Sequence, residues 1–418
     1  MQFIYYINIS LSVLLIFWPL LYTKYFLKIQ IINPFTLAWS VMFPVDLMIN
    51  YGGPALLIDD WIDNDGYQLA IAMNNLKIIS GFFSMIFFYK ILIKVNFAKY
   101  LMNFCRKFKN INYERVGNYF ILLYIILFCY ISGSEYGVLN WVSNPRTGYQ
   151  LYRVGQGHLY ALLVSILSIA FVLKSLDWDN HRKVIINFFL FLLFVYLLGN
   201  KISFFLYFIT TLTFLWFGKW KYLNIFIFTI APLIFLIALY NFSLSSNDSL
   251  DILEIASYFD HYYNGANYYN SFLKGEINLY YGEVFLSSFW SYVPRAFYPD
   301  KPFVYGSLLI NEYFFPGMAE ASNTPAFGGA VDSFADFGIF GVVLFGVLNP
   351  IFIVNSFISY IFFRFGDIFL PIRKNLILLL ILCLAFGPGF AMFISGPLLL
   401  VFLISVAITI SQSSRLRI

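Results

Sequence analysis

Three arginines are the residues of this chain best suited to hold a phosphate group. Arg146 and Arg153 occur in the stretch Gly133–His158. Arg295 occurs in a longer polar stretch, Asn241–Phe337. A guanidinium group is a planar fork that binds two phosphate oxygens at once and stays charged when partly buried. If the three side chains converge, they form a pyrophosphate site; otherwise each one reaches the lipid interface or pairs with a nearby acid.

A second set of residues could accept a proton from a hydroxyl group. The candidates are His261, Asp336 and Glu135, and the sequence does not choose among them. A histidine near pH 7 suits this task. Asp336 lies near a membrane boundary, where a carboxylate is costly unless it is paired, so it is a candidate base or a partner for an arginine.

Other polar residues of the same stretches are expected to contact a substrate. Asp332 precedes Asp336 by one helical turn, so both could face one cavity; alternatively, Asp332 caps the start of its helix. Prolines on both sides of Arg295 restrict the backbone that carries it and Lys301. The expected substrate-binding residues are Lys301, Glu135, His158, Tyr298 and Asp332.

Metals and cofactors are not expected. The acids of the polar stretches do not form the close pair that a metal site would demand, so we expect metal-independent chemistry without a cofactor. The three cysteines are far apart and support neither a disulfide framework nor a zinc site.

The elements that must position these residues are membrane helices. Hydrophobic residues make up 61% of the 418-residue chain and charged residues 11%, against roughly 45–50% and 25% in soluble domains. The sequence therefore predicts an all-α, polytopic integral membrane protein. At about 20 residues per span, about eleven spans are expected: Phe3–Thr23, Ile31–Asn50, Ile71–Ile93, Tyr119–Ser132, Leu159–Leu173, Val184–Leu198, Ser203–Phe217, Tyr222–Tyr240, Ile339–Phe363, Leu376–Phe393 and Leu398–Ile410.

The orientation follows from the basic residues. Most of the 26 lysines and arginines fall in alternate connections or at the C-terminus, which marks that side as the cytoplasm. The N-terminus and the loop 241–337 are then periplasmic and the C-terminus cytoplasmic. We expect a single membrane domain, with eight helices and the outer loop 133–158 in residues 1–240, the large loop in 241–337, and three helices in 338–418.

Several motifs resemble a known family. Asn144–His158, the run VPRAFYPDKP around Arg295 and the run NTPAFGGAVDSFADFG look like the oligosaccharide repeat-unit polymerases of bacterial surface polysaccharides, the O-antigen polymerase or Wzy family. Ten residues separate Arg146 from Gly157, and ten separate Arg295 from Gly306. This repeated arginine-to-glycine spacing is similar to paired motifs of such polymerases.

The resemblance implies a glycosyltransferase with a GT-C-like fold in the bacterial inner membrane. Its substrates would be undecaprenyl-pyrophosphate-linked oligosaccharides at the periplasmic face. A sugar hydroxyl would attack the anomeric carbon of the donor, and Arg146, Arg153 and Arg295 would stabilise the departing pyrophosphate. A chain-length regulator protein is an expected partner, and nucleic acid is not.

Two alternatives share part of this pattern. An O-antigen ligase uses the same donor but delivers the chain to lipid A core. A flippase for lipid-linked repeat units would carry charges at mid-membrane, whereas here the polar residues gather in the outer loops.

Overall fold

The computed structural model describes residues 2–28, 51, 61–96, 112–175, 181–199, 261–293, 298–320, 325–349, 352–353, 356 and 360. The chain divides into two compact units. Unit 1 comprises Met1–Phe88, Ser246–Val293 and Asp300–Ser356, and unit 2 comprises Tyr89–Ser245, Pro294–Pro299 and Phe357–Ile418.

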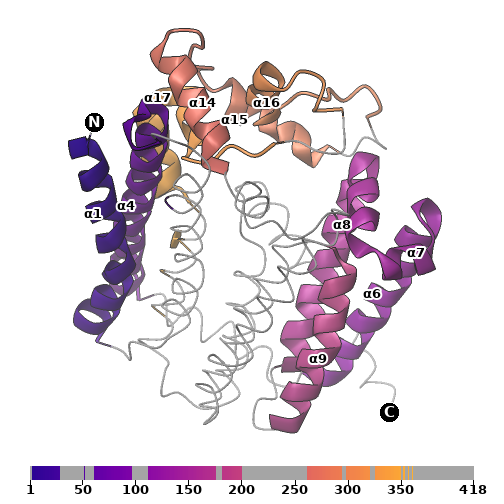
Figure 1. Ribbon diagram of the computed structural model, residues 1–418. Coiled ribbons are helices and arrows are strands. Elements are labelled where there is room, and N and C mark those ends of the chain that lie inside the picture. The colour runs from indigo at the N-terminus through magenta and orange to yellow at the C-terminus, as the bar shows by residue number, and fades with distance from the viewer. Residues whose placement is uncertain are drawn as a thin grey trace. The chain divides into compact units, whose positions relative to one another are not determined.

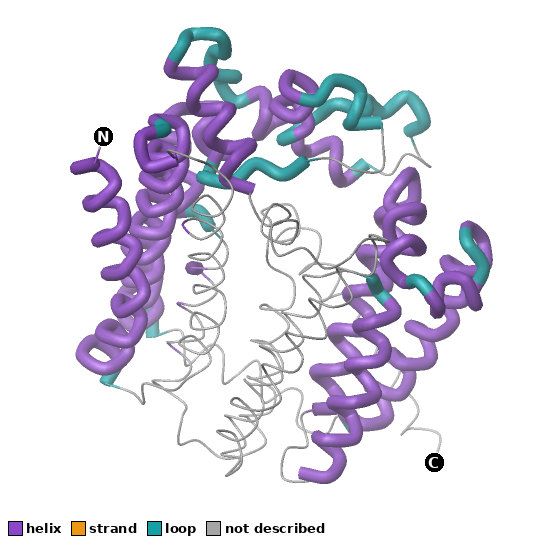
Figure 2. The backbone as a smooth tube through the Cα atoms, in the orientation of Figure 1, coloured by secondary structure: helices purple, strands orange, loops and turns teal. Residues whose placement is uncertain are grey.

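The described residues form helices joined by loops and contain no strand (Figure 2). Within these described ranges, three helical segments are long and apolar enough to cross a membrane: Ile4–Phe26, Asp65–Lys94 and Tyr113–Ser134. These helices agree with the predicted helical membrane protein, while the eleven spans and the GT-C-like fold stay predictions. Five expected spans lie outside the described residues: Ile31–Asn50, Ser203–Phe217, Tyr222–Tyr240, Leu376–Phe393 and Leu398–Ile410.

In unit 1, two apolar helices are joined by buried polar side chains. α1 (Gln2–Leu21) and α4 (Asp65–Lys94) run in the same direction, and η1 (Tyr22–Leu27) continues α1 as a π-helix. The Asn8 amide donates to the Gln68 carbonyl at 2.9 Å, and the Ser12 hydroxyl donates to Asn75 Oδ1 at 3.2 Å. In an apolar environment, burying apolar side chains between two helices adds little stability. Hydrogen bonds between polar side chains therefore specify how the helices pair.

The last described helix of unit 1 follows α4 closely. α17 (Val331–Val347) has the same direction, because Gly329, just before it, lies against Ala70 and Gly346 against Lys77. A Cβ atom on Gly346 would lie 2.6 Å from the Lys77 carbonyl oxygen. Only a glycine permits this approach of the two backbones.

The described helices of the large polar stretch form a folded cap at the first turn of α4 in unit 1. It contains α14 (His261–Leu273), α15 (Glu283–Ser287), η5 (Ser288–Tyr292) and α16 (Leu308–Phe314). The Gly66 N–H donates to Asn270 Oδ1 at 2.9 Å, which ties α14 to α4. The start of α1 lies at this same end, beside η3 (Trp61–Asp63) (Figure 1).

Unit 2 contains a bundle of long helices. α6 (Tyr113–Glu135) and α8 (Pro145–Ser175) are antiparallel, because Gly117 near the start of α6 lies against Lys174 at the end of α8. α7 (Val138–Ser143) connects them, and α9 (His181–Leu197) follows. The stretch 133–158, expected to be a loop, is therefore mostly helical, and α8 begins well before the span expected at Leu159–Leu173.

Candidate functional site

Asp336 is the most enclosed acid of the described residues. Its side chain is 0% exposed. Oδ1 accepts the N–H groups of Gly282 and Val284, both at 3.0 Å, and Oδ2 accepts the N–H of Phe285 at 2.7 Å. These N–H groups lie at the start of α15, where backbone N–H groups have no acceptor within their own helix. The carboxylate of α17 thus caps α15.

A kink in α17 immediately follows this carboxylate. Phe337 and Gly338 have non-helical backbone angles, and Gly338 has φ +60° with ψ −142°, a conformation essentially limited to glycine. At the break, backbone carbonyls of α17 lose their donors within the helix. The Ala335 carbonyl instead accepts a hydrogen bond from the Tyr280 N–H at 2.8 Å. The kink and the Asp336 bonds together fix the segment before α15 against α17.

A tyrosine-rich segment, residues 261–270, forms most of α14. Tyr262, Tyr268 and Tyr269 are buried, while Tyr263 is 51% exposed. The Tyr269 hydroxyl donates to the Gly329 carbonyl at 2.6 Å. Burial raises the pKa of Tyr269, so the phenol stays protonated and keeps this bond. These tyrosines position the start of α17.

Asp332 and Asp336 do not share one environment, although one turn separates them. Asp332 is exposed and lies in the first turn of α17. No side-chain bond caps this helix at Ala330, so the capping alternative is not observed. Protein surrounds Asp332 closely enough that desolvation raises its pKa; Lys77 lowers the pKa and Asp336 raises it further. The two carboxylates therefore differ in their partners: backbone N–H groups enclose Asp336, whereas neighbouring charges act on Asp332.

Lys77 is a residue that the sequence analysis missed. It is half-buried in α4, within electrostatic reach of Asp332. The signal was present in the sequence, because a lysine inside a long apolar helix is costly and is retained for a reason.

Lys301 and Tyr298 lie close together in the chain but in different surroundings. Lys301 is 9% exposed, and its Nζ lies 4.5 Å from the centroid of the Tyr305 ring. Tyr298 is 45% exposed. An ammonium group over an aromatic face gains a favourable electrostatic contact with the ring, so Tyr305 helps to hold the Lys301 side chain in place.

Arg146 occupies the second position of α8, where the local sequence favours a helix start. Asn144 Oδ1 accepts the Thr147 N–H at 3.3 Å, and Pro145 fills the first helical position, which needs no N–H donor. The Arg146 guanidinium lies 5.4 Å from the centroid of the Tyr149 ring. The positive end of the helix dipole adds to its charge.

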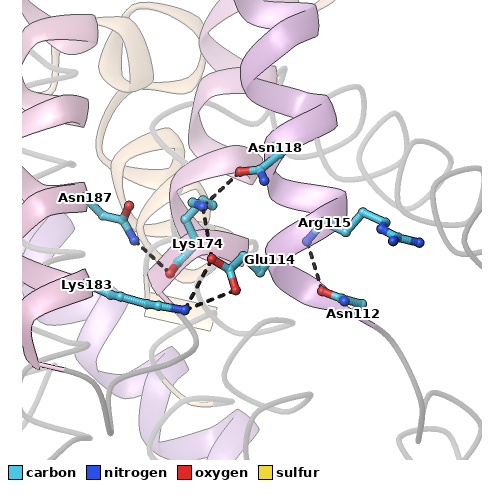
Figure 3. Close-up of polar contacts among 7 residues, drawn as sticks. All are labelled: Asn112, Glu114, Arg115, Asn118, Lys174, Lys183 and Asn187. Carbon is cyan, nitrogen blue, oxygen red and sulfur yellow. Dashed lines mark hydrogen bonds and ion pairs between the residues drawn. The ribbon is translucent and has the colours of Figure 1, made fainter.

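The opposite end of this bundle carries a cluster of exposed charges. Lys183 lies 3.2 Å and Lys174 3.8 Å from the Glu114 carboxylate, and Lys174 also donates to Asn118 Oδ1 at 2.9 Å. Figure 3 shows both lysines directed at the single acid. These residues belong to connections predicted to be cytoplasmic. Arg146 lies at the other end of α8.

The convergence of the three arginines stays a prediction. Arg295 lies outside the described residues. The backbones of Glu135, Arg153, His158 and His261 are helical, but their side chains are not described. Arg146 and Arg153 are two turns apart on α8, about 10 Å along its axis. Within the described ranges, no group of three or more histidines, cysteines or acids could hold a metal.

The two glycines of the arginine-to-glycine spacing occupy different structures. Gly157 lies inside α8. Gly306 has φ +59°, and its N–H donates to the Ser287 hydroxyl at 2.8 Å. The shared spacing therefore reflects two different local requirements, of which only the second needs the freedom of glycine.

Comparisons with known proteins agree with the family resemblance. A stretch of 206 residues is 28% identical to the O-antigen polymerase of Salmonella typhimurium strain LT2, and the match to the O-antigen polymerase of Salmonella typhi has the same length and identity. No family model matches, and no solved structure matches. The match covers 48% of this chain and about half of each relative, 49% of its length. The chain is thus similar to O-antigen polymerases, as its arginine-containing motifs predicted.

Proposed function

We propose that this chain polymerises undecaprenyl-pyrophosphate-linked oligosaccharide repeat units into O-antigen or a related polysaccharide. The observation that carries the proposal is its similarity to two O-antigen polymerases over 206 residues. The helical, apolar character of α1, α4 and α6 supports a place in the inner membrane. A chain-length regulator is a proposed partner.

The proposed reaction is a glycosyl transfer from a lipid pyrophosphate. The hydroxyl of an acceptor sugar attacks the anomeric carbon of the growing chain, and the pyrophosphate departs with negative charge. Cations fixed near the leaving group stabilise the transition state more than the ground state. Arg146 fits this role, because Tyr149 holds its guanidinium group and the N–H groups at the start of α8 place a partial positive charge beside it, which also favours an anion. Arg153 and Arg295 are proposed to act with it.

The cap of unit 1 is proposed to face the periplasm together with the N-terminus. Both lie at one end of α4, while exposed Lys90 and Lys94 occupy the other end of that helix. Basic residues gather at the cytoplasmic side of membrane proteins. The C-terminus is proposed to be cytoplasmic.

Asp336 is proposed to act as a positioning residue in place of the catalytic role first considered. A general base must reach the hydroxyl it deprotonates, and this carboxylate is buried under three N–H groups. His261 and Glu135 remain candidate bases. Lys301, Tyr298 and His158 are proposed to contact the substrate.

The test is complementation of a strain that lacks this chain, read from the bands of its lipopolysaccharide. Loss of a polymerase leaves one repeat unit on lipid A core, whereas loss of a ligase leaves lipid A core bare while polymer accumulates on the lipid carrier. The wild-type chain should restore the ladder of long chains.

A series of variants tests the proposed role of Arg146 at the leaving group. Arg146→Ala should reduce long chains by on the order of 10²-fold, and Arg146→Lys should restore them only in part because it lacks the planar fork. Arg115→Ala is the matched control, because this arginine is exposed and only its backbone N–H, which donates to the capping Asn112 side chain at the start of α6, has a structural role there. Normal long chains from Arg146→Ala would refute the assignment.

A further inference from the structure

The segment formed by α15 and η5, residues 283–292, turns its hydroxyl groups toward the protein. The Ser287 hydroxyl donates to the Glu283 carbonyl at 2.6 Å and accepts the Gly306 N–H at 2.8 Å. The Ser288 hydroxyl donates to the Phe285 carbonyl at 2.6 Å. Both serines are half-buried. These hydroxyl groups therefore have protein partners and need no water.

The same segment exposes large apolar side chains. Leu286 is 65% exposed, and Phe289, three residues later, is also exposed. Residues three apart in a helix lie on the same side of it. Serines turned inward and apolar side chains turned outward are the reverse of a helix that faces water. An exposed apolar patch of this kind marks a surface that contacts a membrane or another protein.

The membrane helix α17 continues this apolar surface. The ring of Phe285 lies 5.3 Å from the ring of Phe345, measured between centroids. A Cβ atom on Gly282, just before α15, would lie 3.0 Å from Cζ of Phe337. α17 itself has exposed apolar side chains at Ile339, Phe340 and Val343. The segment therefore extends an apolar surface that α17 presents.

The length of α4 locates the membrane boundary at the cap. The helix has 30 residues, which is about 45 Å at about 1.5 Å per residue. The hydrocarbon layer is roughly 30 Å thick, or about 20 helical residues. Lys90 is exposed near the end of α4 and marks one boundary of this layer. The other boundary then lies near Ala70.

The packing of α17 on α4 places the segment at this boundary. Gly329, just before α17, lies against Ala70, and Gly346 lies against Lys77. Asp336, whose carboxylate accepts the N–H groups at the start of α15, falls between these two contacts. Ala70 and Lys77 are about 10 Å apart along α4. The start of α15 is thus within about 10 Å of the boundary, on its hydrocarbon side.

We propose that α15 and η5 are inserted into the lipid leaflet at the cap end of α4, with Leu286 and Phe289 among the acyl chains. Amphipathic segments bind membranes by burying their apolar face about 5–10 Å deep between head groups and acyl chains. Glu283, the one charged residue of the segment, is exposed at its start. The inference is independent of the proposed function, because it depends only on α4 crossing the membrane. The insertion holds the cap on the lipid surface.

Electron paramagnetic resonance tests the insertion. The full chain, with Cys105, Cys129 and Cys383 replaced by serine, carries a nitroxide label at Leu286→Cys. It is reconstituted in nanodiscs of phosphatidylethanolamine and phosphatidylglycerol. Oxygen concentrates in the bilayer, whereas a nickel chelate stays in water. The label should therefore collide more often with oxygen than with the chelate, and so should a label at Phe289→Cys.

Leu273→Cys is the matched control. Leu273 belongs to the same cap and is 57% exposed, but exposed Lys274 and Glu276 follow it at the end of α14. Its label should show the opposite preference and collide more often with the nickel chelate. Phe340→Cys gives the value for the exposed apolar surface of α17. The melting temperature of each labelled protein shows whether it is folded.

A second measurement uses the same cysteines without the nitroxide. In nanodiscs, a membrane-impermeant maleimide should react several-fold faster with Leu273→Cys than with Leu286→Cys. After unfolding in sodium dodecyl sulfate the two variants should react equally, which shows that both cysteines are intact. Equal rates in the nanodiscs would contradict the insertion.

Three results of the resonance experiment would overturn the proposal. A preference for the nickel chelate at Leu286→Cys and Phe289→Cys places the segment in water. Few collisions with either reagent mean that protein covers the patch. A preference for oxygen that appears only after undecaprenyl phosphate is added assigns the surface to a polyprenyl chain. Because no reading requires polysaccharide synthesis, failure of the proposed function leaves this inference intact.

Discussion

The two units use carboxylates in opposite ways. In unit 1, Asp336 is 0% exposed and holds three N–H groups of another segment. In unit 2, the Glu114 side chain is 56% exposed and pairs with two lysines, Lys174 and Lys183 (Figure 3). A buried acceptor leaves its donors unsatisfied when it is removed, whereas water replaces an exposed one. The two carboxylates are therefore expected to contribute very different amounts to the free energy of unfolding.

A second contrast concerns what shapes each candidate site. In unit 1 the hydrogen bonds of Asp336 fix the cap, and the helix kinks at Gly338, directly after the bonded segment. In unit 2 the surroundings of Arg146 depend on apolar packing against Trp141 and on the cap at Asn144. The first arrangement joins segments distant in sequence, and the second is mostly local.

The largest effect is expected from Asp336→Ala. Three buried N–H groups lose their acceptor, so the free energy of unfolding should fall by about 4 kcal/mol. The melting temperature of the detergent-purified protein measures this. Asp332→Asn, one turn away and exposed, should change stability by less than about 1 kcal/mol. Equal losses in the two variants would erase the contrast.

Gly148→Ala tests whether packing governs the outer end of unit 2. The new Cβ would lie 2.4 Å from Trp141 Cδ2, and overpacking of this kind costs about 2–3 kcal/mol. Gly133→Ala in α6 is the control, since its nearest neighbour would be 3.9 Å away. A thermal melt of both proteins should show loss only for Gly148→Ala. A stable Gly148→Ala protein would contradict the packing shown.

Asn144→Ala should have a smaller effect. It removes the side-chain acceptor for the Thr147 N–H, which typically costs about 1 kcal/mol. Because Arg146 lies in this turn, long-chain polysaccharide should fall a few-fold as well. Asn144→Ser keeps a capping oxygen and should restore both readouts. If it restores stability without activity, Asn144 has a role beyond the cap.

Glu114→Gln should have the smallest effect. An exposed carboxylate shared by two lysines contributes about 0.5 kcal/mol or less, and salt screens it further. Melting at low and at high salt should therefore give nearly equal values for wild type and variant. A loss above about 2 kcal/mol would show that this cluster resembles Asp336 after all.

Part of the fold could be predicted because it depends on composition and local pattern. Hydropathy located α1, α4 and α6, since a membrane helix needs a long apolar run. The helical character of residues 138–158 was missed, because glycines and charges there suggested a loop. The cap at Asn144 and Pro145 was the signal for a helix start.

For the candidate site, the sequence predicted which residue types take part but not which groups they contact. Asp336 was recognised as costly, but no pattern shows that its carboxylate binds the N–H groups of Gly282, Val284 and Phe285, more than fifty positions earlier. Lys77 escaped notice because its relation to Asp332 depends on two helices lying side by side.

By itself, the sequence determined a helical membrane protein that resembles O-antigen polymerases, because hydrophobic transfer and short motifs act locally. Only the tertiary structure decided that Asp336 is enclosed while Asp332 is open, since the kink at Gly338 and the packing of α17 on α4 arise from contacts across the chain. Two aspartates one turn apart thus received different surroundings, and burial and hydrogen bonding control what a carboxylate can do.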